Sequence, residues 1–414
     1  MGKTSKIILI LCIVLYAVIF ITYLSFESPK PNAQVSLSKY FSSEKINAGK
    51  KYFNERVMLS LTAFFLKIGF LFLLYKLKIW NNVYLFFTKR IKNNFLRSFI
   101  YTFTLSFFLF GILLFPLNLF SYFHLKSYKI IITPFWLYIK DFLMGAAIFS
   151  FGAAIIAAIG IWIYRIRERL FPLFASIFVL VFAFFMMIIY PVFITPLFND
   201  FSRLKNPELE KKITEMLNKR GIKVKNLFVV NASVRTLGAN AYVAGLGPTK
   251  EIVLYDTLIK DYNNDEILSI LAHELGHYEK NHVIIGILAM PLSNPFAILA
   301  FFIFLSYIVK RVRQKNPDTV YHVPLILLIV IIAFQISMPL TNAISRRMER
   351  DADFHSLVVT KNSAAFISSQ VKISSKHYYS NYDPNVFYKM LYYTHPPVKE
   401  RIGMALAMPD KMID

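Results

Sequence analysis

The distribution of hydrophobic and polar residues divides the chain into long apolar stretches and two polar portions. Seven stretches are long enough to cross the hydrocarbon core of a membrane, which takes about 20 apolar residues. They cover approximately Ile7–Leu24, Val57–Leu77, Ser98–Phe120, Phe142–Tyr164, Leu170–Phe198, Val283–Val309 and His322–Ile344. This pattern predicts a multi-pass α-helical membrane protein with seven transmembrane helices.

Two of the seven stretches carry features that leave alternatives open. The first follows two lysines, as a signal peptide would, but it is long and no small-residue cleavage site follows, which favours a retained anchor. Pro291, Asn294 and Pro295 interrupt the sixth. Irregular backbone at membrane depth is tolerated only where protein or a water-filled cavity surrounds it. The sixth stretch is therefore either kinked or lines an enclosed cavity.

The larger polar portion, residues 199–282, has the pattern of a small α/β unit. Apolar residues at four-residue spacing predict a helix over 206–220. Segments rich in β-branched and aromatic residues predict strands over 225–234, 240–246 and 251–257. A further helix is predicted from Asp265 to His282.

This last helix carries His-Glu-Leu-Gly-His at positions 273–277. On a helix, His273 and His277 project from one face a turn apart and can bind one metal ion. Glu274 lies where it can reach a water on that metal rather than the metal itself. The motif alone is also compatible with an amphipathic helix that carries two surface histidines.

A second run, Glu-Arg-Asp-Ala-Asp at 349–353, supplies what a catalytic zinc ion requires, a third protein ligand that leaves one position for water. Glu349 is the candidate ligand. Asp353 lies one helical turn further on the same face and could orient a ligand imidazole through its N–H. Asp353 could equally be a solvated acid in a charged run.

The motifs divide the chain into four predicted parts. Residues 1–198 would contain transmembrane helices 1–5, and residues 283–345 transmembrane helices 6 and 7. Residues 199–282 would be a peptidase insertion with the metal helix. Residues 346–414 would complete the peptidase domain and supply the third ligand.

Composition narrows the possible ligands and partners. The chain is 56% hydrophobic and carries a formal charge of +23. Its basic residues lie mainly between apolar stretches, where they flank membrane helices and meet anionic lipid, so membrane lipid is favoured as a partner over nucleic acid. Cys12 is the single cysteine, which excludes an intramolecular disulfide and a cysteine-based zinc site. His and carboxylate ligands suit one Zn²⁺ per chain.

Several ordered segments resemble the type I CAAX prenyl endopeptidases, which are integral-membrane zinc metallopeptidases. The resemblance covers at least Pro196 to the end of the chain. It rests on Pro196-Leu197-Phe198, Asn240-Ala241-Tyr242, the strand Ile252 to Leu258, His273 to His277, Asn342 to Arg347, Glu349 to Asp353, His395-Pro396 and Glu400-Arg401. It implies that the seven helices enclose a water-filled chamber with the zinc site at one end.

The resemblance also implies roles for individual residues. His273, His277 and Glu349 would be the zinc ligands, and Glu274 would be the general base. The segment Asn240, Ala241 and Tyr242 would lie on an edge strand that pairs with the substrate backbone. His395 would donate to the oxyanion, and Arg401 would support the site electrostatically.

The expected function is zinc-dependent hydrolysis of peptide bonds near the C-terminus of isoprenylated peptides. One alternative is a membrane-protein quality-control protease with no prenyl requirement. A catalytically silent seven-helix receptor or transporter is a further alternative, against which the complete ligand set argues. The residue bias suggests an AT-rich genome and favours the bacterial cytoplasmic membrane over the endoplasmic reticulum.

The side of the membrane on which the site lies is left open by the sequence. The family places the insertion in the cytosol. The basic loops 78–97 and 165–169 would be cytoplasmic under the positive-inside rule, which puts the insertion on the opposite side. Other short loops are basic as well, so the family's topology is preferred.

Overall fold

The computed structural model describes residues 34–77, 79–245, 250–282, 323–377 and 381–408, with a few single residues elsewhere. Within these ranges, four helices are long and apolar enough to cross a membrane: Ser43–Lys76, Asn94–Leu113, Phe135–Ile166 and Val323–Thr360. The shorter α7 (Phe171–Ile189) is also strongly apolar. The protein is therefore multi-pass and helical. The first and sixth predicted stretches lie outside the described residues, so the number seven stays a prediction.

The helices mostly follow the apolar stretches, with local differences. The second, fourth and seventh stretches lie in α2 (Ser43–Leu77), α6 (Phe135–Ile166) and α13 (Val323–Thr360). The third stretch is not one helix, because α4 (Asn94–Phe107) passes into a π-helical segment, Phe108–Leu113, and α5 (Phe115–Ser127) begins with a proline in its first turn. Proline cannot donate to the preceding turn, which separates the two helices. The short α3 (Ile79–Arg90) precedes α4.

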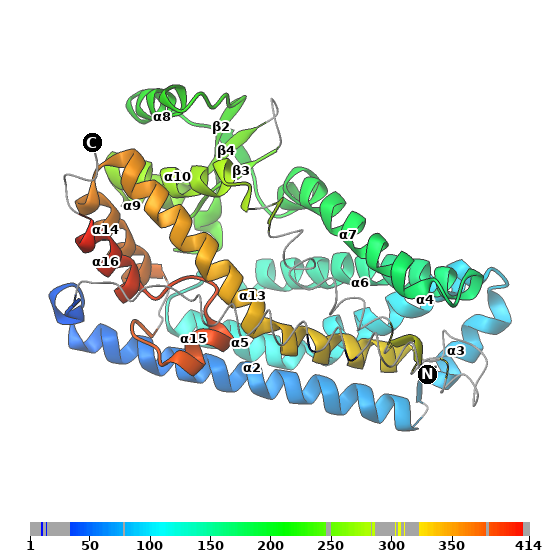
Figure 1. Cartoon of the computed structure of the whole chain (residues 1–414). Helices are drawn as coiled ribbons and strands as arrows, with labels where there is room; N and C mark the ends of the chain where they lie inside the picture. Colours follow the sequence, from blue (N-terminus) through cyan, green and yellow to red (C-terminus); the bar gives the residue numbers. More distant parts are fainter. Residues whose placement is uncertain are drawn as a thin grey trace.

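Small residues let the membrane helices pack closely. Along one face of α6, Ala146, Ser150, Ala154 and Ala158 recur every fourth residue and are buried. This face packs against α4, where Ser and Thr side chains are also buried. Small side chains allow two helix backbones to approach, which is how helices associate where lipid removes the hydrophobic driving force. A second contact joins α13 to α2, and Figure 1 shows these two helices running side by side.

The polar insertion contains a four-stranded sheet above the long helices (Figure 1). Its strands are β1 (Phe201–Arg203), β2 (Asn226–Val230), β3 (Ala241–Ala244) and β4 (Glu251–Tyr255), in the order β1-β2-β4-β3. β2 and β4 are parallel, while β1 and β3 pair antiparallel with their neighbours. β3 therefore lies at one edge of the sheet, and the three predicted strands are confirmed.

Two helices pack on this sheet through an apolar core. α8 (Pro207–Lys219) begins at Asn206, whose side chain accepts from the Leu209 N–H, and it confirms the helix predicted over 206–220. α8 contributes Leu209 and Ile213 to a cluster with Leu254 and Leu275. The short α9 (Asp256–Asp261) links β4 to α10 (Asn264–Glu279).

α10 is the predicted metal helix, and local sequence fixes both its ends. At its start, Asn263 and Glu266 form a capping box, in which each side chain accepts from the other residue's backbone N–H. The predicted end of this helix at His282 is wrong by three residues. The helix ends at Glu279 because Asn281 takes a left-handed conformation with φ 53°, which asparagine tolerates.

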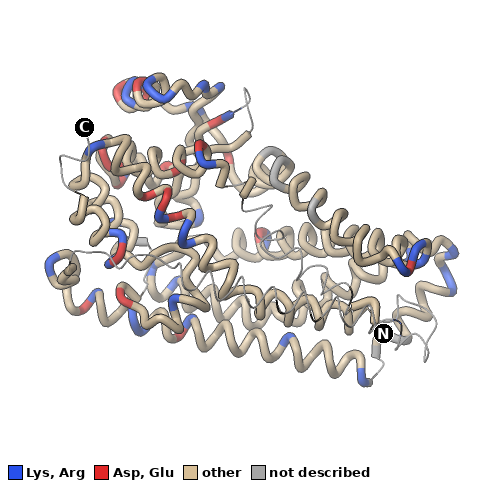
Figure 2. Tube along the Cα trace, viewed as in Figure 1, with Lys and Arg blue, Asp and Glu red and all other residues tan. Residues whose placement is uncertain are grey.

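The C-terminal part of the chain packs around α13. This helix continues unbroken past residue 345, and its second half lies against α10. α14 (Ser363–Lys372), α15 (Val386–Tyr392) and α16 (Val398–Ala407) complete this end of the molecule. Figure 2 shows that charged residues gather here and around the sheet, while the long helices are largely uncharged.

Gly276 sets the distance between α10 and α13. A Cβ atom built on it would lie 3.0 Å from the His355 Cβ and 3.1 Å from the Ala352 Cα. Contacts this short force the neighbouring atoms to move. A side chain at 276 would therefore push the two helices apart.

We expect Gly276→Ala to lower both the thermal stability and the metal content of the protein. Gly160→Ala in α6 is the control, because a Cβ atom there meets nothing within 4 Å and alanine favours a helix over glycine by about 1 kcal/mol. Thermal unfolding and elemental analysis of both purified variants provide the measurement. If both behave alike, close packing at Gly276 does not hold the site together.

Candidate active site

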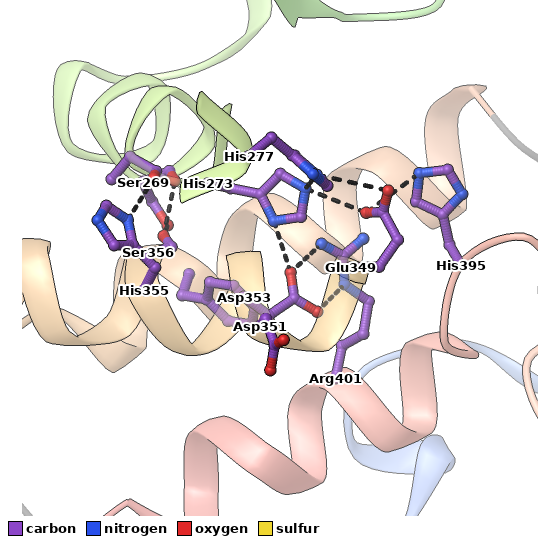
Figure 3. A network of polar contacts seen from close by, with 12 residues as sticks. Ser269, His273, His277, Glu349, Asp351, Asp353, His355, Ser356, His395 and Arg401 are labelled. Carbon is purple, nitrogen blue, oxygen red and sulfur yellow. Dashed lines mark hydrogen bonds and ion pairs between the residues drawn. The ribbon is translucent and has the colours of Figure 1, made fainter. Parts of the chain in front are cut away.

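The motif residues of α10 and α13 meet between the two helices (Figure 3). The Nε2 atoms of His273 and His277 lie 3.1 Å apart. The Glu349 carboxylate lies 3.1 Å from the His273 Nε2 through one oxygen and 3.4 Å from the His277 Nε2 through the other. His273 and Glu349 are each 8% exposed, so the cluster is buried.

These three side chains have the chemistry and convergence of a metal site. One ligand atom from each of His273, His277 and Glu349 lies within 4.8 Å of the others. The Glu349 Oε2 is buried and has no hydrogen-bond partner, although two imidazoles face it. Three donor atoms that converge on one point at these distances fit a cation between them. Two imidazoles and one carboxylate form the ligand set of many catalytic zinc sites.

A second layer of charges holds His273 in place. Its Nδ1 lies 2.8 Å from the Asp353 carboxylate, whose side chain is fully buried. Arg401 of α16 donates to the same carboxylate through two nitrogens, with Nε at 2.8 Å. Asp353 thus joins a ligand to the C-terminal helix and is not a solvated acid.

Burial and neighbouring charges shift the pKa values within the cluster. Burial opposes the charge on His273, but Asp353 and Glu349 outweigh this effect and raise its pKa to about 10. Burial would raise the pKa of Glu349, but His273 and His277 outweigh it and hold that pKa well below its usual range. Desolvation raises the pKa of Glu274, which favours a carboxyl group able to take up a proton.

His395 completes the cluster from the loop between α15 and α16. Its Nε2 lies 3.3 Å from the Glu349 Oε2, and its side chain is 58% exposed. Two polar side chains of α13 bind the backbone of α15, the helix that precedes the His395 loop. Asn342 donates to the Met390 and Leu391 carbonyls. The fully buried Arg346 donates to the Lys389 and Tyr393 carbonyls, within and just after α15.

The segment predicted to bind substrate lies at the start of the edge strand. The Asn240 carbonyl accepts from the Tyr255 N–H of β4, and the Asn240 side chain accepts from the Ala241 N–H. Asn240 is exposed and Ala241 is buried. Burial raises the pKa of Tyr242 to about 12, so its hydroxyl is not a proton donor of use near neutral pH.

Comparison with known proteins identifies the family. Peptidase family M48 matches residues 203–408, and the CAAX prenyl protease N-terminal domain, described as five membrane helices, matches residues 27–200. The chain is 34% identical to the CAAX prenyl protease 1 homolog of Arabidopsis thaliana, over 72% of this chain and 71% of that protein. The chain belongs to peptidase family M48. Membership implies a metal cofactor and a peptide or protein substrate.

Other similar proteins extend this comparison. An uncharacterized metalloprotease of Bacillus subtilis, YhfN, is 35% identical over 59% of this chain, and the match spans just 58% of the YhfN length. The crystal structure of S. mikatae Ste24p aligns over 98% of this chain and 99% of that one, with a TM-score of 0.71 and 20% identity. At that identity the similarity establishes the fold of the M48 chain. The match to the N-terminal domain with five membrane helices supports an integral membrane protein.

Two further histidines that belong to no sequence motif lie close to the M48 site. His282 is 5% exposed and its Nδ1 lies 3.1 Å from the His277 Nδ1. His355 is 8% exposed, bonds the Ala272 carbonyl through Nδ1 and faces Glu279. Neither is a surface residue. The predicted helix runs through His282 and no motif includes His355, so neither residue has a signal in the sequence.

We expect Arg401→Gln to destabilise the protein strongly. Loss of the guanidinium leaves the buried Asp353 carboxylate without its countercharge, which costs about 3–5 kcal/mol for a buried pair. Lys399→Gln on the same helix is the control, because Lys399 pairs with the exposed Asp383 and such pairs contribute about 0–1 kcal/mol. Thermal unfolding in detergent measures both. Equal melting temperatures would show that Asp353 does not depend on Arg401.

Proposed function

We propose that this M48 protein is a zinc-dependent membrane endopeptidase that cleaves near the C-terminus of isoprenylated peptides. The convergence of His273, His277 and Glu349 on one point is the observation that carries the proposal. The CAAX prenyl protease homolog of Arabidopsis supports the substrate class. We also propose that seven helices surround a chamber and that the peptidase portion lies at one end of it. The four-part division of the chain is part of the same proposal.

The proposed mechanism assigns one task to each residue. His273, His277 and Glu349 would hold the zinc ion, which when bound would lower the pKa of a water and polarise the scissile carbonyl. Glu274, next to His273 on α10, takes the proton of the attacking water and delivers it to the leaving amine. His395, exposed beside Glu349, donates to the carbonyl oxygen as negative charge develops there. Asp353 and Arg401 hold the His273 ring in orientation.

Glu274→Gln should keep the metal and lower turnover by roughly 10²- to 10⁴-fold, because glutamine matches the shape of glutamate but cannot accept the proton. Asp265→Asn, an equal change in the exposed first turn of the same helix, is the control. Steady-state cleavage of a peptide, together with zinc content, gives the measurement. Turnover near that of the control would remove Glu274 from the mechanism.

Substrate binding along β3 follows from the pairing of the strand. The Tyr255 N–H donates to the Asn240 carbonyl, and hydrogen-bonded residues alternate along an antiparallel pair. Tyr242 therefore directs its backbone toward β4, while Val243 directs its N–H and carbonyl toward the free edge. The Ala241 N–H is occupied by the Asn240 side chain. Val243 is thus the main-chain donor offered to an extended substrate.

Val243→Pro should lower kcat/KM by up to about tenfold, since the loss of one hydrogen bond costs about 0.5–1.5 kcal/mol. Proline is tolerated on an edge strand where the N–H points outward, so the sheet and the metal should remain. Val243→Ala shortens the side chain but keeps the N–H and is the control. Equal kcat/KM for the two variants would mean that the substrate does not pair with Val243.

The quality-control alternative differs in substrate and shares the chemistry. The similarity to the Bacillus metalloprotease keeps it open and supports a bacterial cytoplasmic membrane, with the endoplasmic reticulum as the alternative location. One peptide, assayed with and without its isoprenyl group, separates the two hypotheses. A clear preference for the isoprenylated form supports CAAX processing, and equal rates support quality control.

A further inference from the structure

A tight turn follows α10 immediately. The Lys280 N–H donates to the Gly276 carbonyl, and the Asn281 N–H donates to the Tyr278 carbonyl. Asn281 then takes its left-handed conformation, which ends the helical path of the backbone. The Lys280 ammonium donates to the Asp351 carbonyl at 3.2 Å, which joins the turn to α13. The residue after Asn281 is thus held at a fixed place beside the metal cluster.

That residue is His282, whose ring packs on the ring of His277. The ring centroids are 5.1 Å apart at an interplanar angle of 71°, and the two Nδ1 atoms are 3.1 Å apart. The other nitrogen of His277, Nε2, faces His273 and Glu349. The two nitrogens of His277 therefore have separate partners, with the metal cluster on one side and His282 on the other.

We propose that His282 is a positioning residue of the metal site. It accepts the Nδ1–H of His277, which fixes the orientation of that ring and leaves the Nε2 lone pair free for the metal. His273 is held in the same way, with Asp353 at 2.8 Å from its Nδ1. Each ligand imidazole thus has its own partner at Nδ1, a carboxylate for His273 and an imidazole for His277. The inference rests on the metal binding in the proposed function.

Two other roles for His282 are a fourth metal ligand and a residue that only fills space. Each predicts a behaviour different from that of a positioning residue. As a fourth ligand, His282 would present a nitrogen to the point where the donor atoms converge, yet the atom that contacts His277 lies at the Nδ1 side of that ring. Within the described residues, the convergent donor set consists of His273, His277 and Glu349. As a packing residue alone, His282 would affect stability but not the metal.

Variants at 282 and a matched control at 355 separate a positioning role from a packing role. His282→Leu and His282→Phe both remove the hydrogen-bond acceptor, and His282→Phe keeps an aromatic ring. If one of these variants does not fold, the other is measured instead. His282→Asn keeps an acceptor on a smaller side chain. His355→Leu is the control, because His355 is similarly buried and bonds the backbone of α10 without touching a ligand.

The readouts are the dissociation constant for Zn²⁺, from competition with a chelator, and the visible spectrum of the Co²⁺-substituted protein. We expect His282→Leu or His282→Phe to weaken Zn²⁺ binding roughly 10- to 100-fold and to alter the Co²⁺ spectrum. His282→Asn should recover part of the affinity. Folded His355→Leu should lose clearly less affinity than the acceptor-free variants, because His355 packs between the two helices but bonds none of the three residues of the metal cluster.

Two results would overturn the positioning role. One is unchanged Zn²⁺ affinity and an unchanged Co²⁺ spectrum in the acceptor-free variants. The other is an equal loss in His355→Leu, which would mean that packing alone is responsible. Failure of the proposed function itself looks different, because the unaltered protein would then bind no Zn²⁺ through His273, His277 and Glu349.

Discussion

The close contact between α10 and α13 is the constraint on which the whole site depends. Neither helix carries a complete ligand set, since α10 supplies two imidazoles and α13 the carboxylate. The glycine in the His-Glu-Leu-Gly-His motif permits the approach, because its missing side chain leaves room for His355 and Ala352. A longer separation would leave the three donor atoms too far apart to share one ion. The motif therefore encodes a helix contact as well as a set of ligands.

The contact also concentrates buried charge, and the surrounding residues compensate for it. Asp353 has no solvent exposure, and it is stable there because His273 and Arg401 both bind it. Glu279 of α10 binds Arg220 and His355, which ties α8, α10 and α13 together on the opposite side of the interface. Burial of the Asp353 carboxylate without partners would cost several kcal/mol, so the network favours one relative placement of the helices.

Much of the site could be predicted from sequence because its chemistry follows helical spacing. Two histidines four apart, and Asp353 four after Glu349, lie on single helix faces whatever the fold. The roles of Asn342 and Arg346 could not be predicted. They depend on α15 returning to α13 from more than 40 residues away, and no local pattern specifies that contact. The position of His282 depends on the left-handed Asn281, a conformation that the sequence permits but does not require.

The fold was predictable to a similar extent. Apolar length located the described membrane helices, and β-branched runs located three of the four strands, with β1 missed. The break between α4 and α5 depends on a π-helical segment that hydropathy does not register. Pairing order in the sheet, which makes β3 the edge strand, is a tertiary property. The local sequence pattern thus predicts the helices, the strands and the candidate ligands. The residues that hold the candidate ligands in place are determined by long-range contacts.

Diffraction from crystals of the zinc-loaded protein, recorded on both sides of the zinc absorption edge, is the sharpest test of the metal site between the two helices. We predict one anomalous peak between α10 and α13, at about 2.0–2.2 Å from the Nε2 atoms of His273 and His277 and from a Glu349 oxygen. A peak bound by other residues, or zinc-loaded crystals with no peak between these helices, would contradict this assignment.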